Sequence, residues 1–200
     1  MPRRSNARRG PPGSVRIIAG EWRGRRIPIV DEADVRPTPD RVRETVFNWL
    51  QASIAGARVL DLYAGTGALG FESLSRGATE AWFVEQDARL VEALYAQAES
   101  FGAKPRIVRQ DAAAFLRGSA PQRFDVVFLD PPYALPVEPL LDLLAPWVAE
   151  EGVVYVERPL PPGLPDLEGG EWRKRGHAGT VDYGLLVSRS DAAGRYNAAS

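Results

Sequence analysis

The chain of 200 residues contains no cysteine and a single histidine, His177. Without cysteine it has no disulfide bonds, no thiolate catalysis and no cysteine-ligated metal site. One histidine excludes a site built from several imidazoles, so we predict no metal. An apolar run of about 18 residues, typical of a membrane-spanning helix, is also missing. The basic first residues lead into no apolar stretch, so we expect no secretory signal and a cytoplasmic protein.

Lysine is scarce, and the arginines are unevenly spread. Only Lys104 and Lys174 are lysines among 25 basic residues. Residues 1–43 hold eleven arginines against five acidic residues, although the whole chain has a net charge of −1. A basic front on an acidic body predicts an anionic partner, such as nucleic acid, at that end of the molecule. The alternative is a basic tail with no binding role.

The N-terminal quarter reads differently from the rest of the chain. Val15–Ala19 and Arg25–Val30 have the pattern of two strands joined by a glycine turn. Thr38 and Pro39 then open a helix, as an N-cap residue followed by a first-turn proline. The expected divisions are a flexible basic arm (1–13), an N-terminal hairpin and helix (14–56), a main domain (57–190) and a frayed tail (191–200).

Strand-like and helical patterns alternate from Arg58 onward. Such alternation with buried strands predicts an α/β fold, in which a mostly parallel sheet is doubly wound. Two further runs on either side of Gly179 predict a terminal antiparallel hairpin. The expected strands are 58–62, 80–85, 106–109, 124–129 and 152–156, and the expected helices are 68–76, 88–101, 112–117 and 137–149.

The first strand of the main domain runs into a glycine-rich loop, LDLYAGTGALG. Gly65, Gly67 and Gly70 spell G-x-G-x-x-G, a pattern typical of nucleotide cofactor loops that follow the first strand of a parallel sheet. Glu85 ends the next strand, where a carboxylate can accept hydrogen bonds from ribose hydroxyls. This edge of the sheet therefore predicts a cofactor that contains a ribose.

An acid ahead of the glycines bears on which cofactor this is. Asp61 stands four residues before Gly65 and opposes the pyrophosphate of NAD. S-adenosylmethionine has an α-ammonium and a sulfonium but no phosphate, so Asp61 favours it. Asp111 can accept a hydrogen bond from the adenine amino group, although an aspartate before Ala112 also suits a helix N-cap. A nicotinamide oxidoreductase is the alternative use of the loop.

The fourth strand ends in Asp130-Pro131-Pro132-Tyr133. An exocyclic amine of a nucleobase is a poor nucleophile because its lone pair is delocalised into the ring. The Asp130 carboxylate and the Pro131 carbonyl can accept both amino hydrogens and offset the developing positive charge. Tyr133 offers a flat face on which a flipped-out base can stack. The motif therefore predicts methyl transfer to an amine, and a stiff loop with a core tyrosine is the alternative.

Taken together, these motifs resemble the class I S-adenosylmethionine-dependent amino-methyltransferases. More narrowly, VRIIAGEWRGRRI, RPTPDRVRETVFNWL and LDLYAGTGALGFESLSRGA resemble the RsmD family of bacterial small-subunit (16S) ribosomal RNA guanine-N2 methyltransferases. The resemblance runs from about Val15 to about Ser188. The family motif often ends in Phe where this chain has Tyr133, a change that keeps the stacking face.

The resemblance implies a Rossmann-like enzyme that uses S-adenosylmethionine and no metal. It implies small-subunit ribosomal RNA as partner, alone or in a partly assembled subunit, with the N2 amine of one guanine as target. Methylation of adenine N6 in DNA or RNA, methylation of a glutamine amide, and a non-catalytic RNA-binding module are open alternatives. The implied contacts are Asp130, Pro131, Pro132 and Tyr133 for the target base, and Asp61, Gly65, Gly67, Glu85, Asp111 and Ala112 for the cofactor.

The basic N-terminal part supplies the candidate RNA contacts. The resemblance implies that residues 36–45 lie beside the cofactor and the RNA. Arg41 and Arg43 could instead pair with Asp40 or Glu44 on a solvated helix. The candidates are Trp22, as a stacking side chain, and Arg16, Arg23, Arg25, Arg26, Arg36, Arg41 and Arg43, as phosphate contacts.

Overall fold

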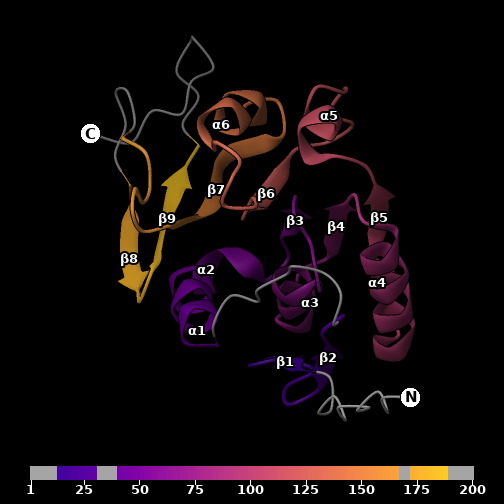
Figure 1. Ribbon diagram of the computed structural model, residues 1–200. Helices are drawn as coiled ribbons and strands as arrows, with labels where there is room; N and C mark the ends of the chain where they lie inside the picture. Colours follow the sequence, from indigo (N-terminus) through magenta and orange to yellow (C-terminus); the bar gives the residue numbers. More distant parts are fainter. Residues whose placement is uncertain (1–12, 31–39, 167–171, 189–200) are drawn as a thin grey trace, which may run out of the picture.

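The molecule is a three-layer α/β structure in which helices cover both faces of one seven-stranded sheet (Figure 1). The computed structural model describes residues 13–30, 40–166 and 172–188. The strands of the sheet are β3 (Arg58–Asp61), β4 (Glu80–Glu85), β5 (Arg106–Arg109), β6 (Phe124–Leu129), β7 (Val148–Pro159), β8 (Lys174–Ala178) and β9 (Val181–Val187). They lie in the order β5-β4-β3-β6-β7-β9-β8. The strands β3 to β7 are parallel to one another, and β9 is antiparallel to β7 and β8, so the predicted doubly wound sheet and terminal hairpin are confirmed.

Two sets of helices bury opposite faces of this sheet. One face packs against α1 (Asp40–Trp49), α2 (Gln51–Ile54), α3 (Ala68–Ser75) and α4 (Ala88–Phe101), and the other against α5 (Ala112–Leu116) and α6 (Glu138–Leu144). Because side chains alternate along a strand, Phe83 and its neighbour Trp82 belong to different hydrophobic clusters. Among the described residues, no helix has the length and apolarity needed to cross a membrane.

A short hairpin forms a second sheet beside α3 (Figure 1). It consists of β1 (Ser14–Arg16) and β2 (Arg26–Pro28), paired antiparallel. Trp22 in its turn stacks on Phe101 of α4, with ring centroids 4.7 Å apart. The backbone N–H of Glu21 donates to the Ser75 carbonyl at the end of α3, at 2.7 Å. The hairpin therefore shares its hydrophobic core with α1, α3 and α4.

The hairpin strands are shorter than predicted. The pattern indicated strands over 15–19 and 25–30, whereas the observed ladder holds three residue pairs. Ile18 and Ala19 leave the ladder because their backbone N–H groups donate to the carboxylate of Glu72 in α3. The predicted arm and tail lie outside the described residues, apart from Gly13.

The boundary between the last helix and the long strand also differs from the prediction. A helix was expected over 137–149, but α6 stops before Pro146, which has no N–H to donate to a further turn. Trp147 is instead buried, and its Nε1 donates to the Leu116 carbonyl at 3.0 Å. The strand expected at 152–156 is extended in both directions in β7, through a kink at Glu151, whose φ is 62°.

Candidate active site

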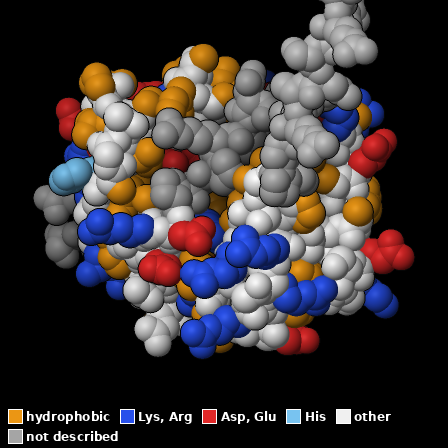
Figure 2. All heavy atoms as spheres, turned by 60° about the horizontal axis from the view of Figure 1, so that its bottom comes forward, with side chains coloured by type: hydrophobic (Ala, Val, Ile, Leu, Met, Phe, Trp, Pro, Cys, Tyr) orange, Lys and Arg blue, Asp and Glu red, His pale blue; other side chains and the backbone are white. Residues whose placement is uncertain are grey.

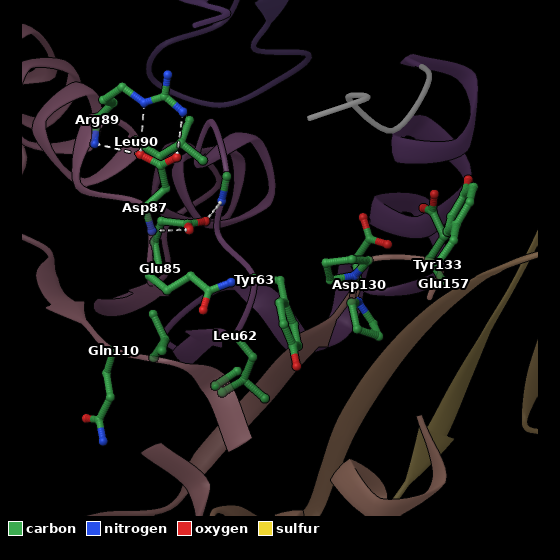
Figure 3. A pocket seen from close by; sticks show the side chains of 16 residues that line it. Leu62, Tyr63, Glu85, Asp87, Arg89, Leu90, Gln110, Asp130, Tyr133 and Glu157 are labelled. Atoms are coloured by element: carbon green, nitrogen blue, oxygen red, sulfur yellow. Dashed lines mark hydrogen bonds and ion pairs between the residues drawn. The ribbon is translucent and has the colours of Figure 1, made fainter. Parts of the chain in front are cut away.

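A cavity of about 600 Å³ opens where β3, β4 and β6 end (Figure 3). Ligands of open parallel sheets bind at this edge, because the loops that follow the strands converge there. Figure 3 shows Glu85, Asp87 and Arg89 on one side of the cavity, Asp130, Tyr133 and Glu157 on the other, and Tyr63 between them. The predicted site residues that line it are Gly65, Glu85, Ala112, Asp130, Pro131, Pro132 and Tyr133.

Glu85 ties the glycine loop to the end of β4. Its Oε2 accepts the backbone N–H of Gly65 at 2.9 Å, and its Oε1 accepts that of Asp87 at 2.9 Å. A carboxylate has about four acceptor sites, so these two bonds are compatible with further bonds from hydroxyl groups. Glu85 therefore presents a carboxylate on the cavity wall, and its predicted hydrogen bonds with ribose hydroxyls stay a prediction.

The three glycines of the loop have different roles. Gly65 borders the cavity. Gly67 has a φ of 78°, and a Cβ there would come within 2.6 Å of Leu94. A Cβ on Gly70 would collide with the ring of Phe83 in β4. Gly67 and Gly70 thus let α3 begin sharply and lie close to the sheet. The predicted contact between Gly67 and a cofactor stays a prediction.

Asp61 lies beneath the glycine loop and is not part of the cavity wall. Its side chain is buried, and its Oδ2 accepts the backbone N–H of Gly70 at 3.1 Å. Burial raises the pKa of Asp61 to about 7, the Gly70 hydrogen bond opposes this rise, and the charge of Glu85 adds to it. Asp61 therefore anchors the first turn of α3, and its predicted contact with an ammonium group stays a prediction.

Asp111 is the N-cap of α5. Its Oδ1 accepts the backbone N–H of Ala114 at 2.8 Å, as the alternative reading of this residue anticipated. Its neighbours Gln110 and Ala112 line the cavity, and sequence reasoning missed Gln110. The hydrogen bond predicted between Asp111 and an adenine stays a prediction, while Gln110 adds a second polar group at the same strand end.

The Asp130-Pro131-Pro132-Tyr133 loop forms the other side of the cavity. All four residues line it, and Tyr133 is 46% exposed, which leaves part of its ring accessible. The Arg158 guanidinium donates to the Tyr133 carbonyl at 3.1 Å and so fixes the end of the loop against β7. The alternative reading of Tyr133 as a core aromatic is therefore wrong.

Glu157 also lines this side of the cavity, and sequence reasoning missed it. It is buried on β7, where its Oε2 accepts the hydroxyl of Tyr155 at 2.7 Å. The signal was visible in the sequence, since Glu157 directly follows the apolar run of its strand, just as Glu85 ends β4.

The cavity is strongly acidic. Glu85, Asp87, Asp130 and Glu157 line it together with one guanidinium, that of Arg89. Arg89 bonds Asp87 at 2.9 Å, and its hydrogen bonds lower the pKa of Asp87 to about 2. The excess of carboxylates favours a cationic ligand and opposes the pyrophosphate of a nicotinamide cofactor.

The prediction that Trp22 stacks on a base is wrong. Trp22 is 8% exposed and lies against Phe101, so its ring is already covered within the core. Its backbone N–H also donates to the Ser75 hydroxyl at 2.9 Å. The sequence suggested an exposed tryptophan in a glycine-rich turn, because the residue of α4 that covers its ring is distant in sequence.

The prediction that Arg43 contacts a phosphate is wrong as well. Its side chain is fully buried, and it donates to the Arg16 carbonyl at 2.9 Å and to Asp40 at 2.7 Å. It also lies 4.0 Å from the buried carboxylate of Glu72. Pairing with Asp40 had been the alternative, but on a solvated helix, whereas this guanidinium joins α1 to the hairpin inside the core.

The other described candidates for RNA contact are exposed. The side of the molecule that carries the hairpin faces the viewer in Figure 2, and Lys and Arg side chains spread over its lower half. Arg25 is held there, since it donates to the carbonyl and hydroxyl of Ser100 and covers the ring of Phe101. Arg36 lies outside the described residues. The exposed candidates are Arg16, Arg23, Arg25, Arg26 and Arg41.

Comparisons with known proteins show the family to which this chain belongs. The family model described as conserved hypothetical protein 95 matches residues 15–186. Ribosomal RNA small subunit methyltransferase D of Escherichia coli K12 is 42% identical over 159 residues, 78% of this chain and 80% of that protein. The Haemophilus influenzae protein of the same name is 38% identical over 180 residues, 86% and 93% of the two chains. The solved structure of yhhF from Escherichia coli superposes with a TM-score of 0.81 at 36% identity, over 90% of this chain and 100% of that one.

Proposed function

We propose that this chain, which belongs to the conserved hypothetical protein 95 family (the RsmD family), methylates small-subunit (16S) ribosomal RNA. The methyl donor is S-adenosylmethionine, and the acceptor is the exocyclic N2 amine of one guanine. The relatives named ribosomal RNA small subunit methyltransferase D support the RNA substrate.

One observation carries this function. The Asp130-Pro131-Pro132-Tyr133 loop opens onto the same cavity as Gly65 and Glu85. The residues proposed to accept hydrogen bonds from the target amine thus face the same cavity as the residue proposed to accept hydrogen bonds from the cofactor ribose. The two must be adjacent for direct transfer between a nucleoside cofactor and a base, since the reacting atoms have to approach to about 3 Å.

The residues on the cofactor side fit S-adenosylmethionine. Glu85 would accept hydrogen bonds from the ribose hydroxyls, and Gly65 leaves room for close approach of the cofactor to the backbone. Gln110 and Ala112, which also line the cavity, would hold the adenine. The acidic lining suits the ammonium and sulfonium charges. When bound, the cofactor supplies an electrophilic methyl group.

The residues on the base side hold the amine. Asp130 and the Pro131 carbonyl accept its two hydrogens, which directs the nitrogen lone pair and offsets positive charge as it develops. Tyr133 stacks on the flipped-out base, a contact worth about 1–3 kcal/mol. Methyl transfer leaves the amine as a positively charged ammonium, which is acidic and releases its proton without a dedicated base, so no histidine is needed.

The exposed arginines of the hairpin and α1 provide a surface for the RNA backbone. Arg25 grips Ser100 at the last turn of α4, whereas Arg89 in the first turn lines the cavity. These two turns are roughly 16 Å apart at 1.5 Å per residue. The substrate would therefore contact the helical face as well as the cavity, whether it is bare RNA or RNA in a partly assembled subunit. A cytoplasmic location is the setting in which such a substrate occurs.

The test is methylation of ribosomal RNA that lacks the modification. Small subunits and bare RNA from a strain without the gene are incubated with the purified protein and labelled S-adenosylmethionine, then digested to nucleosides. We expect label in N2-methylguanosine, and labelling that is slower on the order of 10²–10³-fold with Asp130→Ala. Label in N6-methyladenosine would establish the alternative, and absence of label from both substrates would refute the function.

A further inference from the structure

We propose that the carboxylate of Glu157 reads the N1–H of the target guanine and thereby selects guanine over adenine. Glu157 has this role only if the protein methylates guanine N2 as proposed above. Asp130 and Pro131 would then hold the amine that reacts, while Glu157 identifies the ring that carries it.

The register of the sheet sets Glu157 beside Asp130. β6 and β7 are parallel neighbours in which Leu129 pairs with Val156. Asp130 follows the first of these residues and Glu157 follows the second, so the two acids occupy adjacent positions on strands about 4.8 Å apart. Both side chains line the cavity, and Figure 3 shows them on its same side, with Tyr133.

Tyr155 fixes the Glu157 carboxylate as an acceptor. Its hydroxyl donates to Oε2 of Glu157 at 2.7 Å. Burial, followed by the charges of Glu157 and Asp130, raises the pKa of Tyr155 well above 10, so the phenol keeps its proton and remains a donor. Tyr155 is itself packed between Phe128 and Tyr183, with ring centroids 6.0 Å and 6.5 Å away. The carboxylate is therefore held in one place rather than free to turn toward solvent.

Two adjacent acceptors match the edge of guanine and not that of adenine. Guanine presents its N1–H next to its N2 amine, so both groups donate. Adenine presents a bare N1 lone pair next to its N6 amine, and a carboxylate has no hydrogen to offer it. Placing adenine here would leave a buried acceptor facing another acceptor, and sites built around a hydrogen bond discriminate strongly against a base that lacks it.

The test compares guanine with a base that lacks the hydrogen on N1 but keeps the N2 amine. 2-Aminopurine keeps the N2 amine but has a bare N1, as adenine has. Small subunits are rebuilt around RNA with guanine, 2-aminopurine or adenine at the mapped position, and kcat/KM is measured for wild type and Glu157→Gln. We expect wild type to prefer guanine over 2-aminopurine by about 100-fold or more. Glu157→Gln should narrow this ratio to within about tenfold, because its amide can donate to N1 and still accept from Tyr155.

The outcomes separate failure of the proposed role of Glu157 from failure of the proposed function. If wild type methylates guanine N2 but Glu157→Gln keeps the same preference, the reading role is wrong and the proposed function stands. If wild type methylates adenine equally well, or guanine not at all, the proposed function itself fails. Tyr155→Phe serves as a second variant should Glu157→Gln not fold. It keeps the carboxylate, removes its anchor and should lower the preference for guanine about tenfold, and an unchanged preference would contradict the proposal.

Discussion

The Glu72 carboxylate, buried in α3, accepts the backbone N–H of Ile18 at 2.6 Å. It also accepts the N–H of Ala19 at 3.0 Å and the Nε–H of Arg76 at 2.6 Å. One charged side chain therefore satisfies two backbone groups of the hairpin and one guanidinium. Because the hairpin strands are short, this carboxylate is an important polar link between the hairpin and the sheet domain, beside Ser75, which bonds the backbone of Ala19, Glu21 and Trp22.

We predict that Glu72→Ala lowers the free energy of unfolding by about 3–5 kcal/mol. The change leaves two backbone donors and the Arg76 guanidinium without their acceptor in a buried place. Chemical denaturation followed by tryptophan fluorescence measures the loss. Glu92→Ala, at an exposed position of α4, is the matched control and should stay within about 0.5 kcal/mol of wild type. Equal stability of the two variants would show that the hydrogen bonds to Glu72 do not stabilise the fold measurably.

Asp130→Ala is expected to reduce turnover on the order of 10²–10³-fold, since it removes an acceptor that is needed as the amine becomes positive. The affinity for S-adenosylmethionine should stay within about twofold, because Asp130 lies on the base side of the cavity. Single-turnover methylation and calorimetry measure the two quantities separately. Asp142→Ala, exposed on α6, should change neither. A collapse of cofactor affinity in Asp130→Ala would move this residue to the cofactor side.

Glu85→Ala should have the converse effect. The variant loses the ribose acceptor and frees the N–H groups of Gly65 and Asp87, so we expect S-adenosylmethionine to bind about 10–100-fold more weakly. Calorimetry of the apoprotein measures this, with Glu99→Ala on the exposed face of α4 as the control. Unchanged affinity would mean that Glu85 does not bind the ribose and that the cofactor lies away from the glycine loop.

The architecture was predictable because its signals are local. β4, β5, β6 and α4 have the bounds that their apolar runs indicated, and Gly65, Glu85 and Asp130 reached the cavity as expected. These positions follow from strand ends, and parallel strands bring their ends to one edge. The local sequence pattern was therefore sufficient to predict both the sheet and the two sides of the site.

The errors arose where a contact is distant in sequence. Trp22 and Arg43 looked accessible because nothing near them shows that Phe101 and Glu72 cover them. Asp61 could not be placed on the cavity wall or beneath the loop without knowing how closely α3 packs. Glu157 was missed for a related reason, since its meaning depends on its strand neighbour Asp130 rather than on adjacent residues.

Arg23 and Arg26 are exposed on the hairpin and should contribute to RNA binding through phosphate contacts. We predict that Arg23→Ala/Arg26→Ala weakens binding and lowers the slope of log affinity against log salt by about 1.4–1.8. Filter binding to small-subunit RNA over a range of salt concentrations measures the slope. The control removes two exposed arginines outside the hairpin, Arg117→Ala/Arg123→Ala, which lie at the end of α5 and just before β6, and should leave the slope near the wild-type value. Identical slopes in the two variants would remove the hairpin from the interface.

Asp61 makes the stability of the apoprotein depend on pH in an unusual direction. Burial raises its pKa from 3.8 to about 7 in the folded protein. Between these values the folded state keeps the proton while the unfolded state has lost it, so the folded state binds more protons. Its contribution to stability is therefore fully present below about pH 4 and falls as the pH rises to about 7. Asp87 has the opposite effect, since its folded pKa is lowered to about 2 and its contribution is lost in acid.

Asp61→Asn should abolish this dependence, because the amide keeps an acceptor for Gly70 and does not titrate. We expect wild type to lose up to about 4 kcal/mol relative to Asp61→Asn between pH 4 and pH 7, and the variant to be the more stable protein at neutral pH. Urea denaturation without cofactor, at steps of half a pH unit, measures the difference. Subtracting the two profiles cancels the other titrating groups, which are common to both proteins. If the stability of the two proteins instead changes with pH in the same way, Asp61 is ionised in the folded state. That result would be expected of a carboxylate that contacts a cation at the cavity, and not of one buried beneath the loop.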